Sequence, residues 1–211
     1  MTKNILIFIY LIAFIPNGKA QSNYFEGTIH YKISYTGDSA SIETYKKIMG
    51  TQSEYNFKEG NYKESFISSA NFTAYYNKEE NKNCFKTGDN DTIKCYSGNG
   101  KVEKILNIYK KAGKEENILG LNCKILTMTK DWGGMVTYYY NETIRVNPLW
   151  FSKNYFGSFN VLYRNTKSIP LKIVYNYLSC VVTLEATSIE PGKVNESAFK
   201  LPADFVISYK K

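Results

Sequence analysis

Residues 121–146, LNCKILTMTKDWGGMVTYYYNETIRV, decide the fold class of this chain. On both sides of the DWGG turn, apolar and polar residues alternate with a period of two. That period is typical of a β-strand with one buried and one exposed face. The stretch therefore predicts two antiparallel strands joined by a short turn.

The same alternation recurs through most of the sequence. The other runs are NYFEGTIHYKISY (23–35), EYNFKEGNYKESFIS (54–68, turning at Glu59-Gly60-Asn61), ANFTAYYN (70–77), NCFKT (83–87), CFKTGDNDTIKC (84–95, turning at GDND), PLKIVYNYL (170–178) and VVTLEATSI (181–189). KVEKILNIYK, residues 101–110, fits a helix or a strand, and its neighbours favour a strand. Strand after strand with short polar turns predicts a mainly β fold, a single curved antiparallel sheet.

One segment reads as a helix. ASIETYKKIM, residues 40–49, follows a turn, and Ser39 or Ser41 is suited to cap its N-terminus. Gly50 is placed to end it. We expect a short helix here, between the first two strands.

The first twenty residues have the layout of a secretory signal peptide. One early lysine precedes an apolar run from Ile5 to Ile15, and a small-residue end follows at Ala20. The run is too short to span a bilayer. We expect cleavage after Ala20, which leaves residues 21–211 as one β-rich domain with no transmembrane segment. Because residue 21 is Gln21 rather than cysteine, an N-terminal lipid anchor is not supported.

The charge balance argues against a nucleic-acid partner. The chain has a formal net charge of +8, but among its 27 basic residues only Arg145 and Arg164 are arginine. Nucleic-acid surfaces rely on arginine for bidentate contacts, and no basic cluster here accompanies a recognition motif. Scattered lysine is typical of a solvated surface, and weak attraction to anionic lipid headgroups is the functional alternative.

The four cysteines, Cys84, Cys95, Cys123 and Cys180, indicate disulfides. Their number is even and the chain is expected to be exported. No CxxC pair exists, and the only histidine, His30, shares a strand face with polar residues, so neither a zinc site nor cysteine–histidine catalysis is expected. Three pairings are open. If GDND is a four-residue loop, Cys84 faces Cys95 across the hairpin, which leaves Cys123 for Cys180.

Motifs of catalysis are absent from the sequence. It contains no GxSxG elbow, Walker loop, HExxH or GxGxxG. We therefore expect no enzyme, no catalytic or metal-binding residue and no cofactor. Asp38-Ser39-Ala40 and Asp91-Thr92-Ile93 resemble acceptor sites of a bacterial periplasmic O-glycosylation system, which leaves modification of Ser39 or Thr92 open.

One region interrupts the alternation. NPLWFSKNYFGSFNVLY, residues 147–163, is rich in aromatic side chains without clean periodicity. It is expected either to plug the open face of the sheet or to act as a lid over an apolar ligand. The residues concerned are Trp150, Phe151, Tyr155, Phe156 and Phe159.

Several stretches in this order resemble a known family of exported bacterial proteins. They are YFEGTIHYKISY, ENILGLNCKIL, NPLWFSKNYFGSFNVLY followed by SIPLKIVY, and TSIEPGKVNESAFKLPAD. The resemblance is to GLPGLI-type and outer-membrane lipoprotein-sorting-like proteins, which are related in fold to LolA and LolB. The GLPGLI string itself is absent, and SIPLKIVY stands near its expected place. The lipobox cysteine of many relatives is also missing.

The resemblance implies a half-open barrel, a curved antiparallel sheet around a short helix and loops, in the periplasm or at the outer membrane of a Gram-negative bacterium. It implies a Cys95–Cys123 bond, which leaves Cys84 for Cys180. It further implies a non-catalytic envelope protein that holds a lipid or other apolar ligand against the sheet. The alternative is an accessory or structural envelope protein that acts through a protein-partner surface.

Overall fold

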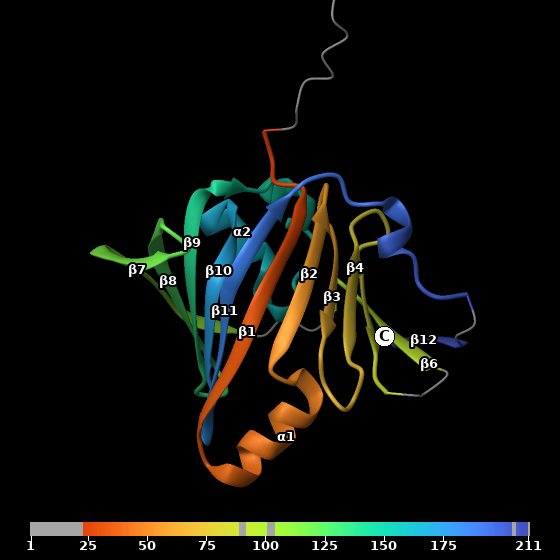
Figure 1. The fold of residues 1–211 in the computed structure, drawn as a ribbon, viewed down its shortest axis with the longest axis horizontal. Helices are drawn as coiled ribbons and strands as arrows, with labels where there is room; N and C mark the ends of the chain where they lie inside the picture. Colours follow the sequence, from red (N-terminus) through yellow and green to blue (C-terminus); the bar gives the residue numbers. More distant parts are fainter. Residues whose placement is uncertain (1–22, 89–91, 101–103, 204–205, 211) are drawn as a thin grey trace, which may run out of the picture.

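The structure is a computed structural model that describes residues 23–88, 92–100, 104–203 and 206–210. The predicted signal peptide and residues 89–91 of the GDND turn lie outside this part of the chain. Within it, twelve strands form one sheet in the order β12-β6-β5-β4-β3-β2-β1-β11-β10-β9-β8-β7. Figure 1 shows that this sheet is strongly curved, with β7 and β12 at its two open edges. The expected mainly β fold with one curved sheet is confirmed.

The strands are β1 (Gly27–Gly37), β2 (Gln52–Lys58), β3 (Asn61–Phe66), β4 (Thr73–Asn77), β5 (Lys82–Lys86), β6 (Thr92–Ser97), β7 (Ile105–Ile118), β8 (Leu121–Lys130), β9 (Met135–Arg145), β10 (Ser168–Asn176), β11 (Cys180–Pro191) and β12 (Val206–Lys210). Each predicted hairpin is present, and neighbouring strands are antiparallel except β12, which runs parallel to β6. The ambiguous 101–110 run is a strand, but it starts at Ile105 and continues to Ile118. Strand β12 was not expected from the sequence.

The alternation sorts side chains between two faces of the sheet. On β1, Ile29, Tyr31 and Ile33 are buried on the inner face. His30 lies on the outer face, where its Nε2 is 3.3 Å from Glu190. Because neighbouring strands bury their own alternate residues on the same side, the inner faces together form one continuous core.

Helix α1 (Ser39–Met49) lies at one end of the sheet (Figure 1). Its N-cap is Asp38, whose side chain accepts a hydrogen bond of 2.9 Å from the backbone N–H of Ser41. The expectation that Ser39 or Ser41 caps the helix is therefore wrong. Gly50 ends the helix as expected, with a φ of 63° that disfavours residues with a Cβ.

The inner side of the sheet is filled by the aromatic segment and the helix that follows it. This part of the chain comprises two 3₁₀ turns, η1 (Pro148–Phe151) and η2 (Phe156–Ser158), and helix α2 (Phe159–Thr166). Leu162 and Tyr163 of α2 are buried in the same core as the inner faces of the strands. A third 3₁₀ turn, η3 (Glu196–Phe199), precedes β12 on the outer side. The curved sheet thus covers α2 on its concave face.

Candidate functional site

The candidate site is a small cavity on the concave face of the sheet, with a volume of about 80 Å³. It lies between the end of α1, the inner faces of six strands, and α2. Its lining is apolar or aromatic at every position but one, Glu64. The lining residues are Tyr31, Met49, Tyr55, Tyr62, Glu64, Phe66, Tyr138, Phe159, Leu162, Tyr163, Ile169, Pro170, Ile173, Tyr175 and Leu184.

Local sequence explains why these side chains converge. Tyr62, Glu64 and Phe66 are alternate residues of β3, so all three point to the inner face. From the opposite side, Phe159, Leu162 and Tyr163 lie at positions i, i+3 and i+4 of α2, which places them on one helical face. The cavity is the space that remains because these three side chains of α2 do not completely fill the concave face of the sheet.

The cavity is open to solvent on one side. Met49, Phe159, Ile173 and Tyr175 line it and are only half-buried. Apolar groups that contact water at a concave surface release that water when a ligand covers them. The gain in free energy is roughly 25 cal/mol per Å² of apolar surface buried. The site is therefore suited to an apolar ligand, and its opening lies between α1, α2 and β10.

Glu64 is the one charged side chain in this lining. One of its oxygens, Oε1, accepts a hydrogen bond of 2.9 Å from the hydroxyl of Ser53 on β2. Within the described residues no lysine, arginine or histidine forms an ion pair with it. Burial raises the pKa of Glu64 from 4.5 to about 7, and the Ser53 hydrogen bond lowers it only in part. Near neutral pH this carboxyl group therefore populates both protonation states.

Tyrosine side chains from several elements surround that carboxyl group. Burial, and secondarily the charge of Glu64, raise the pKa values of Tyr31 on β1 and Tyr163 on α2 above 10. The pKa values of Tyr62 and Tyr175 are also raised, mainly by burial. Because all of these phenols stay neutral at physiological pH, Glu64 is the only member of the cluster whose charge changes there.

The size of the cavity limits what can enter it without movement. Pockets that hold drug-sized ligands occupy about 300–1,000 Å³, and this cavity of about 80 Å³ has space for only a few heavy atoms. A longer apolar ligand must displace half-buried lining side chains such as Phe159 and Met49. Binding of a longer ligand therefore involves α2, the helix that carries Phe159.

The five aromatic residues singled out in the sequence have different surroundings. Phe151 is fully buried and stacks on Tyr163 with ring centres 4.0 Å apart. Trp150 packs against Tyr24 and Phe57 at the end of the sheet opposite α1, and Tyr155 is half-buried. Phe156 is partly exposed against Phe85 and Tyr96. Only Phe159 lines the cavity.

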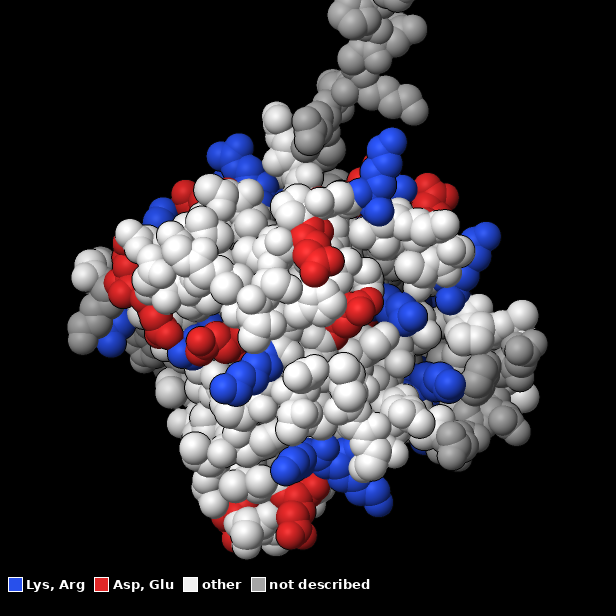
Figure 2. Space-filling view, viewed as in Figure 1, with Lys and Arg blue, Asp and Glu red and all other residues white. Residues whose placement is uncertain are grey.

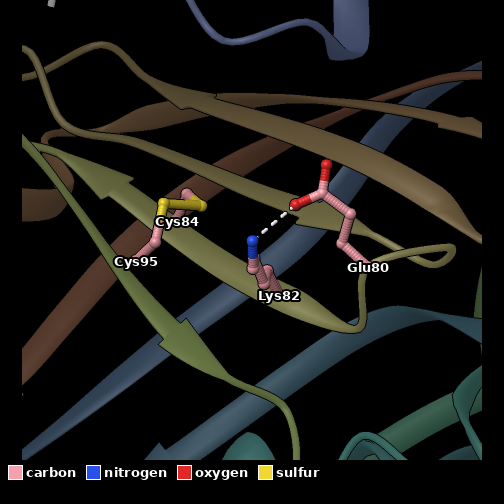
Figure 3. Close-up of a disulfide and its surroundings, with 4 residues drawn as sticks. All are labelled: Glu80, Lys82, Cys84 and Cys95. Carbon is pink, nitrogen blue, oxygen red and sulfur yellow. Dashed lines mark hydrogen bonds and ion pairs between the residues drawn. A yellow bond between two sulfur atoms is a disulfide. The ribbon is translucent and has the colours of Figure 1, made fainter. Parts of the chain in front are cut away.

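The disulfide pairing in the structure differs from the expected one. Cys84 and Cys95 face each other across the β5–β6 hairpin and form a disulfide, as Figure 3 shows. The pairing implied by the resemblance, Cys95 with Cys123 and Cys84 with Cys180, is therefore wrong. Cys123 and Cys180 are buried free thiols in the main core, so the second bond of the hairpin alternative is absent as well. Directly paired positions of an antiparallel hairpin are close enough to bond, and this local proximity decides the pairing.

A larger groove of about 450 Å³ lies on the outer face, between the disulfide-bearing strands and the C-terminal segment. Its lysines and glutamates are largely paired: Lys82 bonds Glu80 at 2.7 Å (Figure 3), and Lys58 lies 3.5 Å from Glu196. The lining of this groove mixes charged and polar residues with apolar ones in similar shares, whereas the lining of the inner cavity is mainly apolar. The smaller inner cavity fits an apolar ligand better despite its size.

The rest of the surface shows no single-sign patch on the face in Figure 2, where lysines and acids are interspersed. In the described part of the chain no helix is long and apolar enough to cross a membrane. No three metal-ligating side chains gather there in a group that could hold an ion. These features leave the concave cavity as the site with the clearest chemical character.

Sequence reasoning missed Glu64, although a signal was present. In NYKESF the acid occupies the same alternate register as Tyr62 and Phe66, so the period of two already placed it on the buried face. A charged residue at a core position of a strand pattern is an exception that marks a functional site or a strained one.

The sequence matches no protein-family model and no curated protein. The structure is similar to an uncharacterized conserved protein from Thermus thermophilus, with a TM-score of 0.49 and 8% identity over 88% of this chain and 91% of that one. It is also similar to the lipoprotein LppX of Mycobacterium tuberculosis (TM-score 0.36, 11% identity, 81% and 90% covered). A LolA superfamily protein of Nitrosomonas europaea gives a TM-score of 0.35 with 8% identity over 84% and 90%. At TM-scores below 0.5 these likenesses assign neither a ligand nor an activity.

Proposed function

We propose that this protein is an exported, non-catalytic envelope protein that binds a lipid or other apolar ligand on the concave face of its sheet. The observation that carries this proposal is the cavity between α1, α2 and β10, whose half-buried apolar lining opens to solvent. Covering such a surface is favourable without any catalytic group. The residues proposed to contact the ligand are Phe159, Met49, Ile173 and Tyr175.

Export is proposed from two features. The first twenty residues have the pattern of a signal peptide, and the Cys84–Cys95 disulfide is a bond that persists in oxidising compartments. Sequencing the N-terminus of the protein from the envelope fraction is expected to begin at Gln21. A chain that keeps its first twenty residues, or remains in the cytoplasm, contradicts this part of the proposal. The GLPGLI-type assignment stays a prediction.

Ligand entry is proposed to require movement of α2. Because the cavity is small, a chain-like ligand gains contact area only by pushing Phe159 and Met49 outward along the concave face. Phe151 stays in place, since its stack on Tyr163 and its full burial hold it in the core. The aromatic segment thus acts as a plug at Phe151 and as an adjustable wall at Phe159.

A neutral fluorescent probe tests the proposal. N-phenyl-1-naphthylamine brightens in apolar surroundings, and we expect saturable brightening with the purified mature protein. Ile173→Trp places a large ring at the mouth of the cavity and should abolish the signal. Val174→Trp is the matched control, because the next residue of β10 lies on the outer face. If Ile173→Trp folds and binds the probe as the control does, the concave site is wrong.

The alternative function, a protein-partner surface, is favoured by one feature of β7. This edge strand exposes Leu106, Ile108 and Tyr109, and open strand edges accept strands from other chains. Crosslinked pull-downs from the native envelope test it. A stable partner that is lost with Ile108→Lys supports this function, and recovery of the protein alone counts against it.

A further inference from the structure

The polar end of the concave cavity is the carboxyl group of Glu64, a half-buried side chain. Oε1 of Glu64 accepts the Ser53 hydrogen bond, and Oε2 accepts none from the described residues but is not one of their buried unpartnered atoms, so it keeps contact with solvent. Two of the nearby hydroxyls have other partners: Tyr31 donates to the carbonyl of Pro170 at 2.7 Å, and Tyr55 is paired with Tyr163. The cavity therefore contains an acceptor oxygen that is open to solvent beside an apolar lining.

A ligand that covers this oxygen removes it from water. A carboxylate covered by apolar groups loses its hydration, and each hydrogen bond that is not replaced adds to the free-energy cost. No described lysine, arginine or histidine lines the cavity to offset the negative charge. A ligand group that donates a hydrogen bond, or carries a positive charge, would offset it on binding.

We infer that the ligand of the concave site is an apolar molecule with an ammonium or hydroxyl group that donates to Oε2 of Glu64. This inference rests on the proposed function and specifies its ligand class. The apolar part lies against Phe159, Ile173 and Tyr175 and extends through the opening, since the cavity itself accommodates only the polar end. A ligand that ends in a carboxylate or phosphate is disfavoured, because two like charges would meet without a base between them.

The preference for a ligand that donates a hydrogen bond over an anionic ligand depends on one titratable group, Glu64. The side chains that face Glu64 from neighbouring elements are Ser53 and Tyr55 on β2, Tyr31 on β1, Tyr62 on β3, Tyr163 on α2 and Tyr175 on β10. None of them is charged below pH 9. Above pH 8, Glu64 is mostly ionised, and the preference for a donor over an anion should be largest there.

Three ligands with the same chain separate the head group from the apolar part. Decylamine, decanol and decanoate are titrated at pH 8.5 against the mature protein loaded with N-phenyl-1-naphthylamine, and displacement is followed by fluorescence. We expect decylamine to bind at least about tenfold more tightly than decanoate, with decanol between them. Glu64→Gln should reduce that ratio to within about threefold, because it removes the charge and keeps the shape.

Glu54→Gln is the matched control. Glu54 lies on the outer face of β2, so the variant removes the same charge away from the cavity and should keep the wild-type ratio. The inference is overturned if decanoate binds as tightly as decylamine to the wild-type protein, or if Glu64→Gln leaves the ratio unchanged. In both cases the dye still binds and the proposed function stands. If neither the dye nor any decyl compound binds, the proposed function fails, and this inference with it.

Discussion

The hydroxyl of Ser53 on β2 lies 2.9 Å from Oε1 of Glu64 on β3, on the concave face of the sheet. Ser53 is itself buried, so the pair is a polar contact between two strands whose other inner residues are aromatic. One donor does not compensate fully for the hydration that a carboxylate loses on burial. The pair therefore links the protonation of Glu64 to the stability of the fold.

The first prediction concerns pH. Because the pKa of Glu64 is raised in the folded protein, its protonated form favours folding below pH 4.5, and this advantage is lost as pH rises through 7. Glu64→Gln should match the wild type near pH 4.5 and be more stable at pH 8.5, by at most about 3 kcal/mol. Urea unfolding at both pH values measures the difference. Glu54→Gln should show no such pH-dependent gain, and an equal gain in both variants would contradict the assignment to Glu64.

The second prediction concerns the cysteines. Non-reducing peptide mapping should recover one crosslink, Cys84 with Cys95, and free thiols at Cys123 and Cys180. Burial and the nearby charges of Glu116 and Glu115 raise the pKa of the Cys123 thiol to about 11, so alkylation at pH 8 should be slow until urea unfolds the protein. Rapid labelling of Cys123 in the native state, or a crosslink to it, would show that the core is arranged differently.

The third prediction concerns the contribution of the disulfide. Replacing both Cys84 and Cys95 with serine should lower the free energy of unfolding by roughly 2–3 kcal/mol, because the bond closes a short loop in the unfolded chain. The double replacement of Cys123 and Cys180 with alanine serves as the comparison. It should still show destabilisation by a reducing agent, whereas the Cys84/Cys95 variant should not. Equal sensitivity of the two variants to reductant would refute the pairing.

The fourth prediction compares a fully buried aromatic residue of the 147–163 segment with a partly exposed one. Phe151→Ala removes a fully buried ring that stacks on Tyr163, and it should destabilise the protein by about 3–5 kcal/mol. Phe156→Ala removes a partly exposed ring and should cost well under half of that. Thermal unfolding compares the two variants. A similar loss in both would mean that the whole 147–163 segment packs as one unit.

The fifth prediction concerns the N-terminus of α1. Asp38→Ala removes the side chain that accepts from the N–H of Ser41 and should lower the free energy of unfolding. Ser39→Ala should have almost no effect, because Ser39 begins the helix but does not cap it. Chemical denaturation of the two variants under the same conditions measures the difference, and a larger loss for Ser39→Ala would restore serine as the cap.

The sequence alone predicted much of the sheet because the relevant signal is local. The run around DWGG matched β8 (Leu121–Lys130) and β9 (Met135–Arg145) to within one residue, since a period of two needs only adjacent side chains. Strand β12 was missed because five residues provide too little alternation, and its partner β6 lies far away in the chain. The cap of α1 was missed because three polar residues within four positions, Asp38, Ser39 and Ser41, are all able to serve.

The concave cavity depends on contacts between distant segments, which local sequence patterns do not predict. Alternation already determined that Glu64 shares a face with Tyr62 and Phe66, and it predicted that residues 147–163 interrupt the strand pattern. Only the tertiary structure decided that Phe159 and Tyr163 of α2 cover that face, and that no described base lies within ion-pair distance of Glu64. The physical reason is that burial and charge pairing depend on how distant segments converge. Strand periodicity and turn residues depend on neighbours in the chain, and those the sequence determines by itself.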